Sequence, residues 1–185
     1  MSSISFNTRR KTFRSAKCYK RCSLQGEEKT KSIMNFFIVC FIVLIDQISK
    51  NYIYQNKVQY EYDLIPIIDG IINFTYLENT GIAFGLFSNF GASRIFFIVF
   101  PIIITFYLIS LLQDKEFQSN SSQISLLLII GGAIGNIIDR IFRGYVVDFI
   151  QFDIDIFPYV FNVADSSVTI GLLFLLCSSI IVQRR

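Results

Sequence analysis

The chain has 185 residues, of which 52% are hydrophobic and 17% are charged. Soluble domains of this size carry about 25% charged residues, so the composition argues against a soluble globular enzyme and predicts a polytopic membrane protein. The sequence contains no histidine. Ser-His-Asp and Cys-His catalysis, histidine-ligated zinc and histidine proton relays are therefore excluded.

The N-terminal residues 1–32 differ from the rest of the chain. They hold nine Lys/Arg and two Glu, a net charge of +7; the whole chain is +3, so residues 33–185 carry −4. We predict a basic, disordered cytosolic extension that helps to fix topology. Two alternatives stay open, a transit peptide and a true start at Met34. Nucleic-acid binding by such a tail is weakly supported, and we predict none.

The four cysteines are Cys18, Cys22, Cys40 and Cys177, and none forms a C-x-x-C pair. Neither a disulfide framework nor a zinc site is expected. Cys40 and Cys177 sit inside apolar runs, where a small buried hydrophobic residue is the default interpretation.

Four apolar segments follow the tail, at about 33–53, 95–113, 120–142 and 165–183. A helix needs about 20 residues to cross ~30 Å of hydrocarbon at 1.5 Å per residue. We therefore predict four transmembrane helices. The first contains Asp46 and Lys50, which must lie at a membrane interface or face the interior of the bundle.

Basic residues near the ends of the spans predict the orientation. The basic tail and Arg184–Arg185 place both termini in the cytoplasm, so the segments 54–94 and 143–165 face outward. The first of these is rich in Tyr, Phe, Ile and Val around a turn signal at Asp69-Gly70. The predicted fold is an all-α membrane protein with four transmembrane helices and a small extracytoplasmic β element in the first outer loop.

Acidic and amide side chains gather near the outer ends of the predicted spans, where ionisable residues are candidates for function. Each also has a structural interpretation. Asp46 and Lys50, spaced i,i+4, can form an interfacial ion pair that orients the first helix. Asp139–Arg140 can be a structural charge pair, and Asp165 can cap the fourth helix. Asn136 and Asn162 can form interhelical hydrogen bonds.

Paired carboxylates are the obvious hydrolytic machinery in a chain without histidine. Two aspartates a few ångström apart cannot both ionise cheaply, so one stays protonated while the pair activates a water. Asp148 and Asp165 are the best pair on position, because both fall near the same membrane surface. Asp139 is the competitor.

Five segments, taken in order, resemble bacterial lipoprotein signal peptidase, also called signal peptidase II. The resemblance covers roughly residues 34–185. The matching segments are Asp46-Gln47-Ile48-Ser49-Lys50, Asn79-Thr80-Gly81-Ile82-Ala83-Phe84, Gly131-Gly132-Ala133-Ile134-Gly135-Asn136-Ile137-Ile138-Asp139-Arg140, Val146-Val147-Asp148-Phe149 and Phe161-Asn162-Val163-Ala164-Asp165.

The resemblance implies an aspartic endopeptidase of the bacterial inner membrane. Such an enzyme cuts prolipoproteins just before the lipobox cysteine that already carries diacylglyceryl, with its active site near the extracytoplasmic surface. By position, the resemblance implies that Asp148 and Asp165 form the dyad and that Asp139 is structural. The implied supporting or substrate-binding residues are Asp46, Lys50, Asn79, Gly81, Ala83, Asn136, Arg140, Asn162 and Ala164.

The implied partners are lipid-modified prolipoproteins and membrane lipids, without nucleic acid, metal or organic cofactor. One chain holds the whole implied site, so we expect a monomer.

Two other functions remain as alternatives. A transport or assembly subunit would place its charges along a path near mid-bilayer, whereas these charges gather at one surface. A hydrolase acting on lipid phosphates would gather several cations. The cations outside the tails and the inner loop are dispersed, at Lys50, Lys57, Arg94, Arg140 and Arg143.

Overall fold

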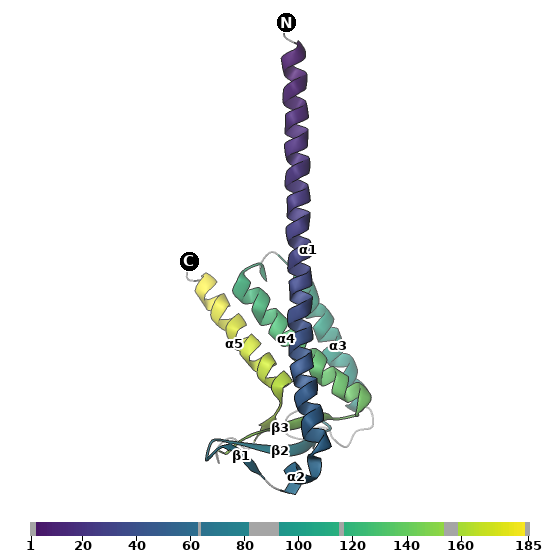
Figure 1. Ribbon diagram of the computed structural model, residues 1–185, viewed down its shortest axis with the longest axis vertical. Helices are drawn as coiled ribbons and strands as arrows, with labels where there is room; N and C mark the ends of the chain where they lie inside the picture. The colour runs from purple at the N-terminus through teal and green to yellow at the C-terminus, as the bar shows by residue number, and fades with distance from the viewer. Residues whose placement is uncertain (1–2, 63, 82–92, 115–116, 154–158, 184–185) are drawn as a thin grey trace. The chain divides into compact units, whose positions relative to one another are not determined.

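The computed structural model describes residues 3–62, 64–81, 93–114, 117–153 and 159–183. The chain divides into two units, Met1–Phe37 and Ile38–Arg185. Helix α1, Ser3–Gln55, begins in the first unit and ends in the second (Figure 1). We predict disorder for residues 1–32, whereas the structure gives them helical backbone from Ser3. This stretch has no proline and a single glycine, Gly26, so little in it breaks a helix.

Four further helices lie in the second unit: α2 (Lys57–Tyr62), α3 (Ser93–Leu111), α4 (Asn120–Phe142) and α5 (Val163–Gln183). The last three begin and end within two residues of the predicted spans, and α1 contains the first span. Helix α4 packs against both α3 and α5. Ser119 caps its start by accepting a hydrogen bond from the Ser122 N–H, and Gly144, with φ 86°, follows its C-cap.

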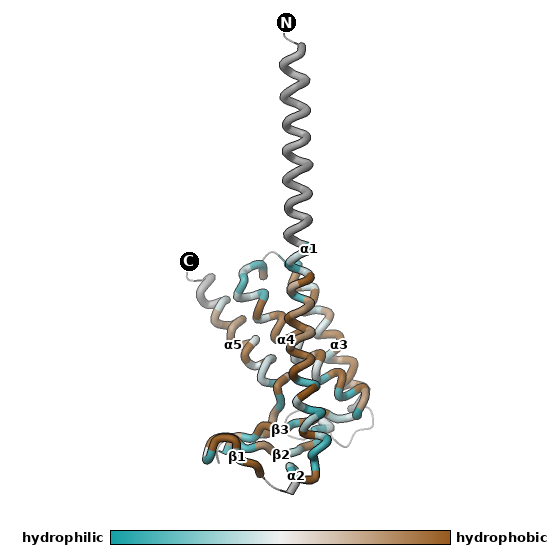
Figure 2. Tube along the Cα trace, viewed as in Figure 1, coloured by the Kyte–Doolittle hydropathy of each residue, from teal (hydrophilic) through white to brown (hydrophobic). Residues whose placement is uncertain are grey.

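Two helical stretches are long and apolar enough to cross a membrane, Lys29–Gln55 and Asn120–Phe142. Helices α3 and α5 contain shorter apolar stretches, Ile95–Leu111 and Val163–Ser178. Figure 2 shows hydrophobic residues along α1, α3, α4 and α5. Many of their large side chains are exposed; examples are Phe37, Phe106 and Leu173. Such exposure is unusual on a soluble monomer but ordinary on a helix that faces lipid.

The prediction that Cys40 and Cys177 are buried is wrong, because both are exposed on their helices. In a membrane protein the outward face of a helix is as apolar as the inward face. Hydrophobic neighbours in the sequence therefore do not identify the interior.

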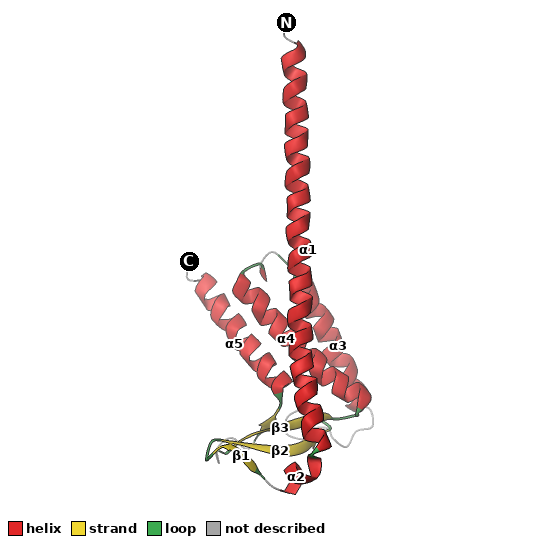
Figure 3. Cartoon of the chain, in the orientation of Figure 1, coloured by secondary structure: helices red, strands yellow, loops and turns green. Residues whose placement is uncertain are grey.

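A four-stranded antiparallel sheet lies in the second unit (Figure 3). Its strands follow the order β1 (Ile65–Ile68), β2 (Ile72–Asn79), β3 (Val146–Phe152) and β4 (Val160–Phe161). The predicted turn at Asp69-Gly70 joins β1 to β2, with Gly70 at φ 70°. The β element is therefore present in the first loop. It is not confined to that loop, because β3 and β4 come from the segment 143–165, where we predicted no strand.

The sheet packs over the end of α1 and over α2 through a hydrophobic cluster. Ile53, Tyr60, Tyr76, Val147 and Phe149 form this cluster. Because successive strand residues point to opposite faces, the side chain of Asp148 points away from the face that carries Val147 and Phe149. The fold thereby directs the carboxylate of Asp148 toward Asn162, at the start of α5.

Candidate functional site

Asp148 is a buried carboxylate held by two amides. It lies on β3 with 1% of its surface exposed. The Nδ2 of Asn162 donates to its Oδ1 at 2.6 Å, and the Nδ2 of Asn79 donates to its Oδ2 at 2.9 Å. Asn79 pairs with Val146 in the β2–β3 register, so it is a diagonal neighbour of Asp148 across the sheet. The N–H of Gly81 donates to Asn79 Oδ1 at 3.1 Å, which fixes the orientation of that amide.

The surroundings of Asp148 favour its protonated form. Burial, and then the nearby charge of Asp165, raise the pKa of Asp148 to about 7, although the two amides and the charge of Lys50 act in the opposite direction. Desolvation and a like charge both disfavour a carboxylate. Near neutral pH, Asp148 can therefore hold and release a proton.

Asp165 lies in the first turn of α5. Asn162 caps this helix: its Oδ1 accepts from the Asp165 N–H at 2.9 Å, while Asp165 Oδ2 accepts from the Asn162 N–H at 3.4 Å. This reciprocal arrangement is a capping box. The interpretation of Asp165 as the N-cap is therefore wrong, because the cap stands three residues earlier. The Nδ2 of Asn136 donates to Asp165 Oδ1 at 2.7 Å.

Asn162 connects the two aspartates. Its amide oxygen receives the backbone N–H of Asp165, and its amide nitrogen donates to Asp148. Its Nδ2 also lies 3.3 Å from Asn136 Oδ1. The expectation of interhelical hydrogen bonds is met by Asn136, which joins α4 to Lys50 of α1 and to Asp165 of α5, whereas Asn162 joins the start of α5 to β3. One side chain both starts α5 and binds the carboxylate on β3.

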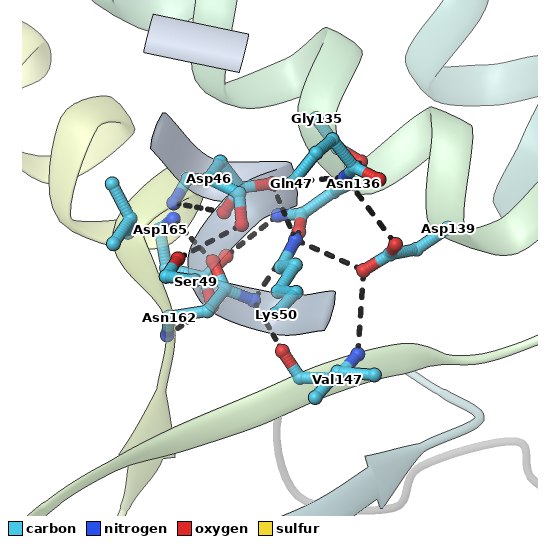
Figure 4. Close-up of polar contacts among 12 residues, drawn as sticks. Asp46, Gln47, Ser49, Lys50, Gly135, Asn136, Asp139, Val147, Asn162 and Asp165 are labelled. Atoms are coloured by element: carbon cyan, nitrogen blue, oxygen red, sulfur yellow. Dashed lines mark hydrogen bonds and ion pairs between the residues drawn. The ribbon is translucent and has the colours of Figure 1, made fainter. Parts of the chain in front are cut away.

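A buried ion cluster lies next to Asn136 (Figure 4). Lys50 Nζ is 2.8 Å from Asp46 Oδ2 and 3.0 Å from Asp139 Oδ2, and the side chains of these three residues are 0% exposed. The predicted Asp46–Lys50 pair is present, and both side chains are buried inside the protein. The predicted Asp139–Arg140 pair is wrong: Asp139 pairs with Lys50 and with Arg143, one turn along α4. Adjacent residues on a helix point about 100° apart, whereas residues four apart share a face.

The same cluster anchors the backbone just before Asp148 and just before Asp165. Asp139 Oδ2 accepts from the Val147 N–H at 3.4 Å, one residue before Asp148. Asp46 Oδ1 accepts from the N–H of the buried Ala164 at 2.9 Å, one residue before Asp165. The buried carboxylates of Asp139 and Asp46 thus hold the two backbone segments that carry Asp148 and Asp165.

Glycines of α4 let the helices approach this closely. A Cβ on Gly135 would lie 2.5 Å from Asp46 Oδ2, and one on Gly132 would overlap the Ala164 carbonyl oxygen. Gly132 and Gly135 were not among the predicted site residues, and neither was Gln47, whose Nε2 donates to Asp46 and Asp139. The signal that could have found them is the G-G-x-x-G spacing beside Asn136. Ala83 lies outside the described residues.

Three cations partly balance the four aspartates of the site. Arg140 is partly buried and interacts electrostatically with Asp165, Asp148 and Asp139. The site then contains three cations and four aspartates, a net charge of −1 when all are ionised. A buried site tolerates net charge poorly, and the raised pKa of Asp148 fits this balance. The cations are Lys50, Arg140 and Arg143, and the aspartates are Asp46, Asp139, Asp148 and Asp165.

A protonated carboxyl beside an ionised one can activate a water molecule and donate a proton to a substrate oxygen or leaving group. Among the residues that the structure describes, no three His, Cys, Asp or Glu side chains are grouped as metal ligands would be. The carboxyl of Asp148, which favours its protonated form, and the neighbouring carboxyl of Asp165 have the chemistry that such an acid–base step requires.

Comparison with known proteins gives concordant matches. The family described as signal peptidase (SPase) II matches residues 38–181. The chain is 36% identical over 143 residues to the lipoprotein signal peptidase of Clostridioides difficile and 41% identical over 143 residues to that of Caldanaerobacter subterraneus. Each alignment covers 77% of this chain and 92% of the relative. A solved bacterial membrane enzyme structure superposes with TM-score 0.70 at 32% identity, covering 80% of this chain and 87% of the other.

Proposed function

Because the chain belongs to the signal peptidase II family, we propose that Asp148 and Asp165 are the catalytic dyad with which it removes signal peptides from prolipoproteins. The chain is an integral membrane protein and a protease. This membership sets aside the transport and lipid-phosphate alternatives. The observation that supports the dyad most directly is the placement of Asn162, which binds Asp148 through its nitrogen and the Asp165 backbone through its oxygen.

The proposed reaction needs one proton on the dyad. Asp148 holds that proton, because burial raises its pKa to about 7, and Asp165 is the carboxylate. Asp165 takes a proton from a water molecule while the water oxygen bonds to the scissile carbonyl carbon. At the same time Asp148 donates its proton to the carbonyl oxygen. When the tetrahedral intermediate collapses, the C–N bond breaks. Asp165 returns its proton to the leaving amine, and Asp148 regains one from the hydroxyl.

The remaining residues support the dyad in this proposal. Asn79 and Asn162 hold Asp148, Asn136 holds Asp165, and Gly81 orients Asn79. Ala164 and Asp139 contribute to the framework through the backbone contacts described above. Lys50 and Arg140 balance the charge of the dyad, and Asp46 pairs with Lys50 and holds the Ala164 N–H. Ala83 is proposed as a site residue from the family resemblance alone.

The proposed substrate is a prolipoprotein whose lipobox cysteine carries diacylglyceryl, cut just before that cysteine. Such a substrate arrives laterally from the bilayer, so the reacting water must lie where lipid and water meet. Asp148 lies on β3 and Asp165 in the first turn of α5, at the end of the apolar helices that adjoins the sheet (Figure 1), which fits this requirement. We propose that α1, α3, α4 and α5 span the bacterial inner membrane, with both termini cytoplasmic and the sheet outside. All the described site residues belong to one chain, which supports a monomer.

A gel-shift cleavage assay in detergent tests the dyad. Asp148→Asn and Asp165→Asn are each expected to abolish cleavage of a diacylglyceryl-modified prolipoprotein while the protein still inserts. Asp153→Asn is the matched control, since this aspartate is exposed at the end of β3, and it should keep wild-type activity. Full activity in either dyad variant would refute the assignment.

Two further results would redirect the assignment. Asp139→Asn is expected mainly to destabilise the protein, so a well-folded but inactive variant would make Asp139 a catalytic candidate. Failure of the folded wild type on a substrate that another signal peptidase II does cut would reject the proposed activity.

A further inference from the structure

We propose that Lys50 is a positioning residue: its ammonium fixes the side-chain amide of Asn136 so that the amide N–H₂ faces Asp165. This inference rests on the proposed dyad and assigns one step in how the dyad is held. Lys50 itself is fully buried, so it contacts neither bulk water nor substrate and acts only through its neighbours.

The ammonium has its full set of partners. It donates to Asp46 Oδ2 at 2.8 Å, to Asp139 Oδ2 at 3.0 Å and to Asn136 Oδ1 at 2.9 Å. An ammonium has three N–H donors and no acceptor. All three donors are used, one toward Asp46 of α1 and two toward Asn136 and Asp139 of α4. The nitrogen is therefore held in place (Figure 4).

The position of this nitrogen decides which way the Asn136 amide points. A lysine can only donate, so the amide oxygen must face Lys50, and the amide nitrogen then faces Asp165 Oδ1 at 2.7 Å. The flipped amide would bring N–H₂ against an ammonium and an oxygen against a carboxylate. Both contacts would be repulsive, so the buried charge selects one orientation.

The other asparagine of the dyad is oriented independently. The backbone N–H of Asp165 donates to Asn162 Oδ1 at 2.9 Å, which already directs its nitrogen toward Asp148. Asn162 Nδ2 also approaches Asn136 Oδ1, but at 3.3 Å and while donating to Asp148 at 2.6 Å. Lys50 is therefore the main constraint on Asn136 among the contacts that the structure describes.

The burial of this lysine supports a positioning role over a role in stability. A buried ion pair is costly to desolvate and commonly contributes little net stability compared with apolar residues of similar size. Here one ammonium is accompanied by two buried carboxylates. A cluster of this kind is useful where it holds a neighbouring group in one orientation.

A double-mutant cycle on kcat and KM tests the inference. Lys50→Met removes the donors at similar length, and Asn136→Ala removes the amide. We expect each single change to lower kcat at least ~10-fold, the size of loss typical of residues that orient a catalytic group, with KM nearly unchanged. Because Lys50 acts through Asn136, Lys50→Met should cause no further loss in the Asn136→Ala background.

Lys57→Met is the matched control. Lys57 lies in α2, outside the ion cluster, and its ammonium lies over the ring of Tyr54. This variant should keep kcat within about 2-fold, which separates loss of a lysine charge from loss of the amide orientation. Multiplicative effects of Lys50→Met and Asn136→Ala, or wild-type kcat in a folded Lys50→Met protein, would overturn the inference.

Asn136→Asp keeps the test decisive if Lys50→Met fails to fold. The new carboxylate still offers an oxygen to Lys50, so the ion cluster is preserved, but it presents no N–H₂ to Asp165. We expect kcat to fall at least ~10-fold, and a wild-type value would overturn the inference. The wild type and Asp165→Asn are assayed in parallel, because an inactive wild type would instead reject the proposed function.

Discussion

Asp148 and Asp165 have the same side chain in different surroundings, and that difference can divide their roles. Asp148 is enclosed on a strand and is bound by neutral amides. Asp165 lies at the positive end of the α5 dipole and accepts from a backbone N–H in addition to Asn136. A pair of carboxylates whose environments differ in this way can hold one proton on a defined member.

The raised pKa of Asp148 predicts a pH dependence of activity. The proton is present below a pKa of about 7 and is lost above it, so kcat should fall on the alkaline side with an apparent midpoint near that value. Because the aspartates interact, the midpoint belongs to the pair. The measurement is kcat against pH, and a constant kcat to about two units above the midpoint would contradict the prediction.

Stability provides a check that needs no substrate. The ordinary pKa of 3.8 is that of the unfolded chain, so between about 4 and 7 the folded state binds the extra proton. The free energy of unfolding should therefore fall as pH rises through this window, by at most about 1.4 kcal/mol per pH unit. Asp148→Asn should remove that slope, as measured by thermal unfolding in detergent.

At the scale of elements, a single asparagine serves both the start of α5 and the dyad, and these two roles can be separated. Asn162→Ala loses the cap and the amide, so it should lose about 1 kcal/mol of stability and most of the activity. Asn162→Ser keeps a capping oxygen but loses the N–H₂ that faces Asp148. We expect this variant to be nearly as stable as wild type yet strongly impaired in kcat.

Thermal unfolding and cleavage kinetics on the same two preparations measure the separation. If the serine variant is as active as wild type, the amide contact to Asp148 has no catalytic importance. If it is as unstable as the alanine variant, Asn162 does not act as the cap.

Helices α3, α4 and α5 could be predicted from the sequence to within two residues, because uncharged apolar runs of about 20 residues have few other stable forms. The helical backbone of residues 3–32 and helix α2 were not predicted. Strand β3 could not. Val146, Val147, Asp148 and Phe149 are all buried, so the strand lacks the alternation that marks a half-exposed strand.

At the site, sequence reasoning selected the residues but not all of their partners. The pairing of Asp139 with Lys50 depends on how two helices face each other, which local spacing does not contain. The close approach at Gly132 and Gly135 is likewise visible only once α4 is placed against its neighbours.

At the scale of the whole molecule, the proposed topology follows from where the basic residues lie. The +7 tail and Arg184–Arg185 should stay in the cytoplasm. Alkaline phosphatase, which is active only outside the cytoplasm, should be active when fused after Asp69 or Asp153 and inactive when fused after Asp114. A fluorescent protein at the C-terminus should fluoresce. The opposite pattern would place the sheet and the dyad in the cytoplasm and contradict the proposed route of the substrate.

Catalysis and the basic tail should prove separable. The family match covers residues 38–181, and all the described site residues lie in the unit Ile38–Arg185. A chain that starts at Met34 should therefore cleave the lipid-modified substrate in detergent with kcat and KM within about 2-fold of the full chain. Its yield in membranes should drop, because removing nine basic residues removes most of the charge that retains the N-terminus in the cytoplasm. A shortened protein that inserts and folds but cleaves poorly would instead show that the tail takes part in binding substrate or in holding the active form.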